Sequence, residues 1–443
     1  MTSRTSGPTT GAPRVSSRLV VAAATAFLMT MTAGIDSASA NLEINGLFDA
    51  RSGAMGGTGV AFLDSAGAIP TNPAALDLID SFVLTVDTFL IGAQPQAPYK
   101  VSHLTDDGVR YENYETIRSA TTWAPLPFLG AAFRFAGRLV IGAAAYPILG
   151  QGTTASYKPA PEEFPNVGYD LDMSMGLVEI AVPISIRIFD NLSLGLSWRA
   201  NYMTQSVKLP YETDMPPLYS QVNEAGEVLY TDLSLSGWNF AGLQVGVLYN
   251  PLPNLSVGLS YRSKMVVKGE GTLKLAALTQ DVRQDVANPH GFRAGFALTV
   301  LDDALLLAAD FKYLLYAESW KTTKLTVLPD RVEETPIKWS DAYTAQLGFE
   351  YKLGDILRLR LGYALATTST NPDYALSNMP PPGASHLFTA GVGIQALDDL
   401  SIDLAAGYVF IESEIEKDTE YNGGIGIYAS HAGEFSLSVT YRL

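Results

Sequence analysis

Residues 192–199 read LSLGLSWR, and this octapeptide alternates between two kinds of side chain at every position. Leu192, Leu194, Leu196 and Trp198 fall on one face of an extended chain, while serine, glycine and arginine occupy the other. Because successive side chains of a β-strand point to opposite sides, this period predicts a strand with one apolar and one polar face. The same alternation recurs at residues 255–262, 357–363 and 435–443. It predicts an all-β fold from residue 82 onward.

Such strands fit two kinds of all-β protein. In a soluble β-sandwich the apolar face points inward and the polar face meets water. In a transmembrane β-barrel the apolar face meets lipid and the polar face lines the lumen, with aromatic side chains at the membrane interfaces. The period is the same in both folds, so the lengths of the connections must distinguish them.

Short turns and long polar connections alternate strictly along the chain. Short turns are expected near residues 136–138, 190–191, 251–254, 302–303, 354–355 and 398–399, and the long connections span residues 204–232, 267–288, 318–340, 367–385 and 412–433. One end of the sheet therefore carries tight turns and the other long loops, as in outer-membrane barrels. Six short turns join twelve strands, and strands at residues 82–92 and 434–443 bring the number to fourteen. We predict a 14-stranded antiparallel transmembrane β-barrel over residues 81–443.

The composition supports this fold and excludes several functions. Charged residues make up only 17% of the 443 residues, and 39 glycines, 22 tyrosines and 18 phenylalanines suit tight turns and aromatic contacts between strands. The absence of cysteine excludes disulfides, cysteine-type zinc sites and thiol nucleophiles. The four histidines are scattered singly, so we expect no metal and no cofactor. A net charge of −16 argues against a nucleic-acid partner.

Residues 1–40 predict a signal peptide. Arg14 and Arg18 precede an apolar run at residues 19–29, and residues 38–40 (ASA) have the small side chains of a cleavage site. A membrane anchor is the alternative, but the run is shorter than the roughly 20 apolar residues of a spanning helix. An exported chain of this composition is either periplasmic or an outer-membrane barrel, and the strand pattern favours the outer membrane.

Residues 41–80 lie between the signal peptide and the first strand and show no alternation. Their centre, residues 52–76, reads SGAMGGTGVAFLDSAGAIPTNPAAL and ends in Asn72, Pro73 and Ala74. A barrel of fourteen strands is too wide for its own side chains to fill. We therefore predict that this compact, glycine-rich segment is a plug (hatch) inside the lumen, and a periplasmic tail is the alternative.

The glycine-rich segment with its Asn-Pro-Ala triplet, together with LSYRS at residues 259–263, LGYA at residues 361–364 and LAAGY at residues 404–408, resembles the FadL family of outer-membrane transporters for hydrophobic compounds. The resemblance implies passive uptake of long-chain fatty acids or aromatic hydrocarbons, with capture by the long loops and a pocket above the plug. It also implies lateral release into the membrane at a kinked third strand. The expected partners are a hydrophobic small molecule and outer-membrane lipid, and we expect a monomer.

Three departures from the family pattern bear on these expectations. Residues 54–56 (AMG) stand where an arginine often follows the first plug glycine, and residues 380–383 (PPPG) replace a usual Pro-Asp. Both leave the substrate type open. The last residue is Leu443 where outer-membrane proteins usually have phenylalanine, although Tyr441 and the alternation before it remain.

The third predicted strand, residues 139–149, contains Pro147 and is followed by Gly150. Proline cannot donate to a strand ladder, so we expect a bulge or kink there. The resemblance assigns Pro147 and Gly150 to the lateral opening and residues 72–74 to the plug. The alternatives are an ordinary strand end at the membrane rim and, for the triplet, a simple turn.

Arginines on the polar face of the strands are candidates for binding a carboxylate headgroup, since arginine offers paired donors to carboxylates. They are Arg199, Arg262 and Arg293, together with Arg358 and Arg360. The alternative is a polar lumen wall in which these arginines pair with Glu350, Asp310 or Asp403.

Three other functions are less well supported by the sequence. A barrel phospholipase needs a Ser-His pair, but Ser385-His386 and Ser430-His431 are neighbours that point to opposite faces of a strand, so no catalytic residue is predicted. Asp302-Asp303 and Asp398-Asp399 lack the repeated ligands of a calcium loop and fit turns. A structural or adhesive barrel and a general porin remain as alternative functions.

Overall fold

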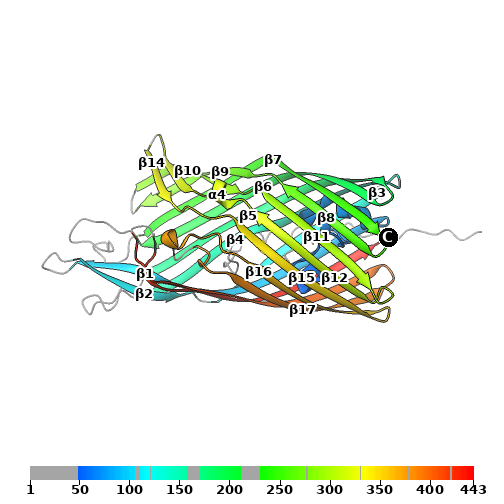
Figure 1. Cartoon of the computed structure of the whole chain (residues 1–443). Coiled ribbons are helices and arrows are strands. Elements are labelled where there is room, and N and C mark those ends of the chain that lie inside the picture. The colour runs from blue at the N-terminus through cyan, green and yellow to red at the C-terminus, as the bar shows by residue number, and fades with distance from the viewer. Residues whose placement is uncertain are drawn as a thin grey trace, which may run out of the picture.

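The computed structural model describes residues 48–104, 110–119, 121–157, 169–210, 230–275, 278–329, 331–376, 379–419 and 422–443. The predicted signal peptide and residues 41–47 lie outside the described residues. The described strands form one antiparallel sheet that closes into a barrel (Figure 1). Closure occurs where β1 (Phe82–Leu104) pairs with β3 (Thr122–Phe135) on one side and with β19 (Gly426–Arg442) on the other.

Fourteen of the 19 described strands form the wall of the barrel. Besides β1, β3 and β19, they are β4 (Leu139–Tyr157), β5 (Tyr169–Phe189), β6 (Leu192–Pro210), β7 (Tyr230–Leu252), β8 (Leu255–Arg262), β11 (Gly291–Val300), β12 (Leu305–Leu314), β15 (Ala342–Leu353), β16 (Leu357–Ala366), β17 (Ser385–Leu397) and β18 (Leu400–Ile415). The other five extend the wall at the long-loop end. These are β2 (Arg110–Arg118), β9 (Met265–Leu275), β10 (Leu278–Asn288), β13 (Thr322–Val327) and β14 (Arg331–Pro336). The predicted strand number is therefore confirmed.

The alternating strands turn their apolar face outward. On β6, Leu194, Leu196 and Trp198 are exposed, whereas Ser193 and Ser197 are buried. The strands that repeat this pattern, β8, β16 and β19, have the same orientation. An exposed apolar face with a buried polar face is the arrangement of a barrel in lipid and the reverse of a soluble sandwich.

The strands are longer than the sequence pattern predicted. Residues 267–288 were expected to be a loop, but they form most of the β9–β10 hairpin, and residues 318–340 contain the β13–β14 hairpin. Beyond the lipid the outer face of a strand no longer needs apolar side chains, so the pattern of a lipid-facing strand ends while backbone pairing continues. The residues at 302–303 and 398–399 do form turns, and no group of metal-binding side chains occurs in the described part of the chain.

Residues 48–80, which we call the inner segment, lie inside the barrel in the half nearer the short turns (Figure 1). The segment contains α2 (Ala50–Ala54), α3 (Ala68–Thr71) and the 3-10 helix η1 (Pro73–Leu78). Helix α2 packs against β16 to β19, and η1 packs against β4 to β8 on the other side. Two short helices at the long-loop end, α4 (Tyr316–Ser319) and η2 (Pro372–Tyr374), complete the described elements. Among the described residues, no helix combines the length and apolar character that a membrane span requires.

Because the apolar face points outward, we predict that a charge on the lipid-facing surface destabilises the barrel more than a charge in a short turn. Leu196 on β6 is 51% exposed toward lipid, and we expect Leu196→Arg to lower the free energy of unfolding in lipid vesicles by about 2–4 kcal/mol. Leu301, in a short turn and 65% exposed, is the control, and Leu301→Arg should cost less than about 1 kcal/mol. Denaturant titration of both variants measures the difference, and equal costs would contradict the orientation.

Candidate functional site

Arg51 of α2 ties the inner segment to the barrel wall. Its Nε and Nη2 donate to the two carboxylate oxygens of Glu350 on β15, each at 2.8 Å, and its Nη1 donates to Asp64 at 3.2 Å. Arg442 of β19 also donates to Asp64, at 3.1 Å. The paired donors of the guanidinium match a carboxylate in geometry and charge, so this contact fixes both the position and the orientation of α2.

The ion pairs continue along the lumen wall. Arg360 donates to Glu350 at 2.7 Å and to Asp403 at 2.6 Å. Glu350 and Arg360 are directly opposite each other on β15 and β16 and are almost fully buried. The interpretation of Arg360 as a wall residue paired with Glu350 and Asp403 therefore holds. Arg51 was missed because it precedes the glycine-rich motif, and sequence spacing alone does not reveal its partner 299 residues away.

A buried carboxyl lies at the start of α2. Asp49 accepts a hydrogen bond from the Arg51 backbone N–H at 2.8 Å and a short one from the Ser65 hydroxyl. Burial raises the pKa of the Asp49 carboxyl, the nearby Asp403 adds to the shift, and the hydrogen bonds from Ser65 and Arg51 oppose it. This carboxyl therefore ties the two ends of the glycine-rich stretch together.

Asn72 is completely buried and joins three parts of the structure. Its Oδ1 accepts the Ala74 N–H at 3.1 Å and so caps η1, in which Pro73 is the first residue. Its Nδ2 donates to the carbonyl oxygens of Val60 at 2.9 Å and of Val247 on β7 at 3.0 Å. The triplet at residues 72–74 thus begins a helix, closes the glycine-rich loop and contacts the wall.

Glycines on three neighbouring strands make room for this triplet. A Cβ atom at Gly246 of β7 would lie 2.1 Å from Asn72 Oδ1, and one at Gly195 of β6 would lie 2.3 Å from Ala74 N. Gly195 and Gly246 are directly opposite each other in the sheet, and Gly258 of β8 faces the Val60 carbonyl in the same way. We call these three glycines the triplet seat. Any side chain on them would push the inner segment away from the wall.

The residues that follow α2 pack closely against a second set of glycines on the wall. A Cβ atom at Gly362 of β16 would lie 2.0 Å from Gly56 N, and one at Gly348 of β15 would lie 2.6 Å from the Thr58 hydroxyl. Gly348 and Gly362 are also directly opposite each other. Gly56 has a φ of +70°, a conformation that favours glycine. The inner segment is therefore held against opposite sides of the barrel.

A cavity of about 250 Å³ lies on the long-loop side of the inner segment. Trp320 and Trp339 stack on each other with ring centroids 4.8 Å apart, and three methionines add soft apolar surface. Within the described part of the chain, Trp339 Nε1 and Ser319 Oγ are buried without a hydrogen-bond partner. The described lining includes one acid, Asp285, and no lysine or arginine. The sequence did not predict this cavity, because its residues come from the long connections.

The third barrel strand, β4, is irregular where Pro147 interrupts it. The pairing of β4 with β5 shifts between Pro147 and Leu149, so Ile148 forms a bulge. Among the described residues, the ladder between β3 and β4 runs from Phe135–Leu139 to Leu129–Ala145 and ends there. Beyond that point β3 pairs only with β1, and β4 pairs only with β5. The expected bulge is therefore present, and the wall lacks a hydrogen-bonded ladder beside it.

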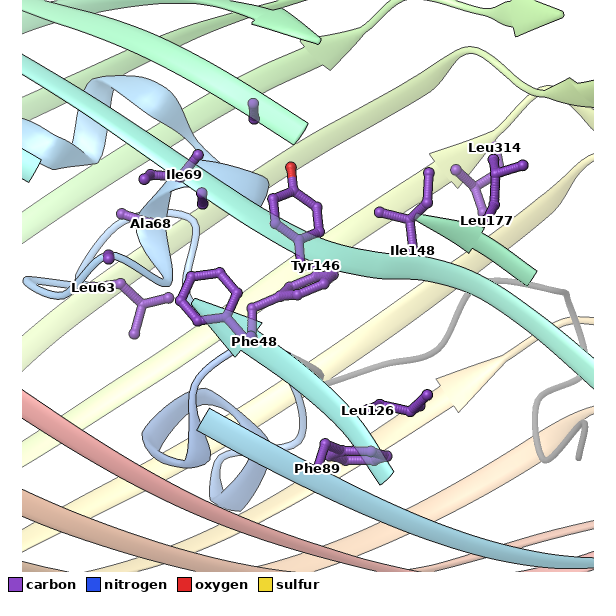
Figure 2. Close-up of a cluster of buried hydrophobic side chains, with 14 of the residues drawn as sticks. Phe48, Leu63, Ala68, Ile69, Phe89, Leu126, Tyr146, Ile148, Leu177 and Leu314 are labelled. Carbon is purple, nitrogen blue, oxygen red and sulfur yellow. The ribbon is translucent and has the colours of Figure 1, made fainter. Parts of the chain in front are cut away.

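Apolar side chains line the inside of the wall at this irregularity. Figure 2 shows Phe48 of the inner segment beside Tyr146, with Ile148 and Leu177 further along the same side. The rings of Phe48 and Tyr146 lie 5.0 Å apart. These residues belong to one apolar cluster that also contains Trp320 and Trp339 of the cavity. Apolar surface is thus continuous from the cavity to the bulge.

The arginines proposed as headgroup ligands lie away from the cavity lining. Arg199 pairs with Glu179, which also accepts the Tyr146 hydroxyl at 2.6 Å, so this arginine supports the irregular third strand. Arg262 donates to Asn288 at 3.2 Å, and Arg293 lies on β11 opposite Ser260 and Lys312. The remaining two, Arg358 and Arg360, are on β16 at the other side of the barrel.

The family description "Outer membrane protein transport protein (OMPP1/FadL/TodX)" matches residues 29–442. The chain therefore belongs to this family of outer-membrane transport proteins, which agrees with its closed barrel. Membership of a transporter family also confirms the expectation that the chain is not an enzyme. Comparison with curated protein sequences gave no match.

Solved structures of transporters share the fold. A FadL homologue from Pseudomonas aeruginosa has a TM-score of 0.74 at 16% identity and covers 91% of this chain and 99% of its own. The toluene transporter TbuX of Ralstonia pickettii has a TM-score of 0.64 at 18% identity, with 91% and 99% covered. The Pseudomonas putida toluene transporter TodX has a TM-score of 0.64 at 18% identity and covers 90% of this chain and 99% of its own.

The triplet seat predicts a strong effect of a single methyl group. We expect Gly246→Ala to cost about 1–3 kcal/mol and to loosen the inner segment, because the new Cβ would overlap Asn72 Oδ1. The matched control is Gly176→Ala on β5, where the nearest atom to a Cβ is 3.6 Å away. Hydrogen exchange of residues 48–80 should rise in the first variant alone. Equal hydrogen exchange of residues 48–80 in both variants would contradict the role of the triplet seat in holding the inner segment.

The ion pairs predict that a substitution of Glu350 destabilises the protein more than Gly246→Ala does. Replacing it by glutamine leaves Arg51 with Asp64 and Arg360 with Asp403 as their remaining carboxylates, and each charge-assisted hydrogen bond that is lost costs about 1.5–3 kcal/mol. We expect Glu350→Gln to release the inner segment and raise ion conductance in planar bilayers. Glu334→Gln, which breaks an exposed pair with Lys324, is the control and should leave the conductance unchanged.

Proposed function

We propose that this outer-membrane transporter takes up small hydrophobic molecules, either long-chain fatty acids or aromatic hydrocarbons, by passive diffusion. The ligand binds in the cavity on the long-loop side of the inner segment and leaves sideways into the membrane between β3 and β4. The observation that carries this proposal is the end of the β3–β4 ladder at Ala145, beside apolar surface that continues from the cavity. Such a path keeps an apolar ligand out of water during release.

We further propose the division of the chain into a signal peptide at residues 1–40, a plug at residues 41–80 and the barrel at residues 81–443, acting as a monomer. The contacts of the inner segment with both sides of the lumen support its role as a plug. In this proposal Asn72, Pro73 and Ala74 form the joint that seats the plug. The inner segment stays in place during transport, because ion pairs and two sets of glycines hold it.

In the same proposal, Pro147 and Gly150 lie at the lateral opening. Pro147 provides no N–H for a ladder, and the pairing shift beside it supports this role. Gly150 is buried just beyond the bulge and pairs with Gly176 of β5. A headgroup role for Arg199, Arg262 and Arg293 stays a prediction, and the pairing of Arg199 with Glu179 favours the wall interpretation.

The cavity favours an aromatic hydrocarbon over a fatty acid. Its described lining has stacked tryptophans and methionines, and it includes no lysine or arginine that could pair with a carboxylate. The names of the solved relatives agree with this choice, since two of them are toluene transporters. A general porin and an adhesive barrel are the alternatives, and both lack a need for this apolar cavity.

Uptake of radiolabelled toluene and oleate by a strain that lacks its own transporters tests the proposal. Cells with the intact protein should take up toluene, and excess oleate should compete weakly. No accelerated uptake of either compound, or a large constant ion current in planar bilayers, would contradict the proposal and favour an adhesive barrel or a porin, respectively.

The route of release has its own test in β4. Deleting Ile148 together with Pro147→Val on β4 and Pro125→Val and Pro127→Val on β3 removes the bulge and restores donors on both strands, so we expect β4 to pair more fully with β3. Toluene binding to the purified variant should persist while cellular uptake falls at least about tenfold, since binding and release use different parts of the path. Asp355→Asn, at an exposed position in a short turn, is the control. Normal uptake by the straightened variant would exclude the lateral route.

A further inference from the structure

A second cavity, of about 360 Å³, is lined by four basic side chains. They are Lys264 and Lys268 around β9, Arg283 of β10 and Lys324 of β13. We call this the basic cavity. Its one acidic lining residue is Asp285, so the described lining carries an excess of positive charge on a chain whose net charge is −16. A concentration of cations on an acidic protein indicates an anionic partner.

The register of the strands places these cations on the outer face. Lys268 lies opposite Asp285, and Arg283 lies between Glu270 of β9 and Thr326 of β13, so these side chains share one face of the sheet. The other face of the same strands carries Val267 and Val286, which belong to the apolar cluster inside the barrel. The basic side chains therefore point away from the lumen.

The ion pairs in the basic cavity are incomplete. Lys264 reaches Glu318 at 3.6 Å, and Lys324 pairs with the exposed Glu334 at 2.6 Å. Lys268 and Arg283 form no ion pair with any described residue. The acids directly opposite them, Asp285 and Glu270, form no ion pair with them in the described part of the chain, so both cations can bind an anion, and arginine in particular can present two donors to one phosphate.

The height of the basic cavity matches the outer edge of the membrane. From Leu255 at the short turn to Lys264, the chain advances nine residues. This rises about 23 Å in a tilted strand, close to the height of about 25 Å of the apolar band of outer-membrane barrels. Tyr261 on the outer face bonds to His290 at 2.8 Å, and Trp238 stacks on Phe240. Aromatic side chains of this kind gather where hydrocarbon gives way to headgroups.

An apolar groove of about 290 Å³ lies on the same outer face, between the basic cavity and the short turns. It is lined by lipid-facing side chains of β7, β8, β11 and β12, including Val245, Leu259, Phe292 and Phe311. Tyr261 also lines the groove and lies three residues before Lys264 of the basic cavity. A groove for hydrocarbon and a cavity for an anion are therefore adjacent along one strand.

We propose that the basic cavity and the apolar groove together bind one lipid of the outer leaflet that carries a phosphorylated headgroup. Lys268 and Arg283 hold the phosphate, and an acyl chain lies in the groove below Tyr261. This site is on the outside of the barrel, across the wall from the transport cavity, with which it shares four lining residues. Bound lipid braces the β9–β10 hairpin against β13, the region that also forms the wall of the transport cavity.

Native mass spectrometry of the full-length protein in detergent tests this site. The probes are diphosphorylated lipid A, dephosphorylated lipid A and inorganic phosphate. We expect tight binding of the diphosphorylated lipid and at least about tenfold weaker binding of the other two probes. The variant Lys268→Gln with Arg283→Gln should bind diphosphorylated lipid A about 100-fold more weakly, roughly tenfold for each lost charge-assisted contact.

The matched control removes the same two charge types at the short-turn end, as Arg138→Gln with Lys352→Gln, and should bind lipid A normally. Circular dichroism and resistance to detergent unfolding establish that both double variants fold. Equal binding of the two lipids, or phosphate binding as tightly as the lipid, would overturn the proposal. So would weaker toluene or oleate binding with unchanged lipid A binding, because the cations would then serve the transport cavity, which shares Asp285, Ala287, Ser319 and Thr322.

Discussion

Backbone hydrogen bonding is the constraint on which this structure depends. Hydrocarbon offers no partner for an N–H or a C=O group, so a sheet in lipid must close on itself. The first and last strands satisfy this requirement through a continuous ladder from Val83–Arg442 onward. In such a wall the β3–β4 ladder is unusual, because both strands continue past its last described pair without pairing to each other. It ends where Pro147 of β4 and Pro125 and Pro127 of β3 remove donors, and buried aromatic and aliphatic side chains cover this part of the wall from inside. We infer that the missing pairing between β3 and β4 serves the lateral release of the ligand.

The interior follows from the same closure. Fourteen strands enclose more space than their own side chains fill, and the inner segment occupies it with helices too short to be stable alone. Its stability comes from the wall. Glycine pairs let the backbone approach closely on two sides, while Arg51 and Glu350 place opposite charges where water is scarce. This rigid base leaves the cavity on the long-loop side as the place for a ligand.

The alternation of residues such as those on β6 predicted the strands, because it shows that one face of each strand is apolar and the other polar, and the spacing of the short turns predicted the number of strands. It did not predict which side of the wall the apolar face occupies, since a sandwich has the same period. The extensions β9, β10, β13 and β14 were taken for loops because both of their faces are polar or mixed. Pro147 revealed the bulge. Arg51–Glu350 and the cavity depend on contacts between distant segments, which no local pattern encodes.

The central claim is that the inner segment stays seated while ligand passes sideways. A disulfide tests it directly, because the chain has no cysteine of its own. A Cβ at Gly130 of β3 would lie 2.8 Å from the Ala66 Cβ and 2.7 Å from the Phe128 ring, so a shift of that ring and of the inner segment allows a bridge between the two positions. Toluene uptake by cells carrying Ala66→Cys with Gly130→Cys is then measured oxidised and reduced. Our account predicts equal uptake in both states, and loss of uptake on oxidation with recovery on reduction would contradict it.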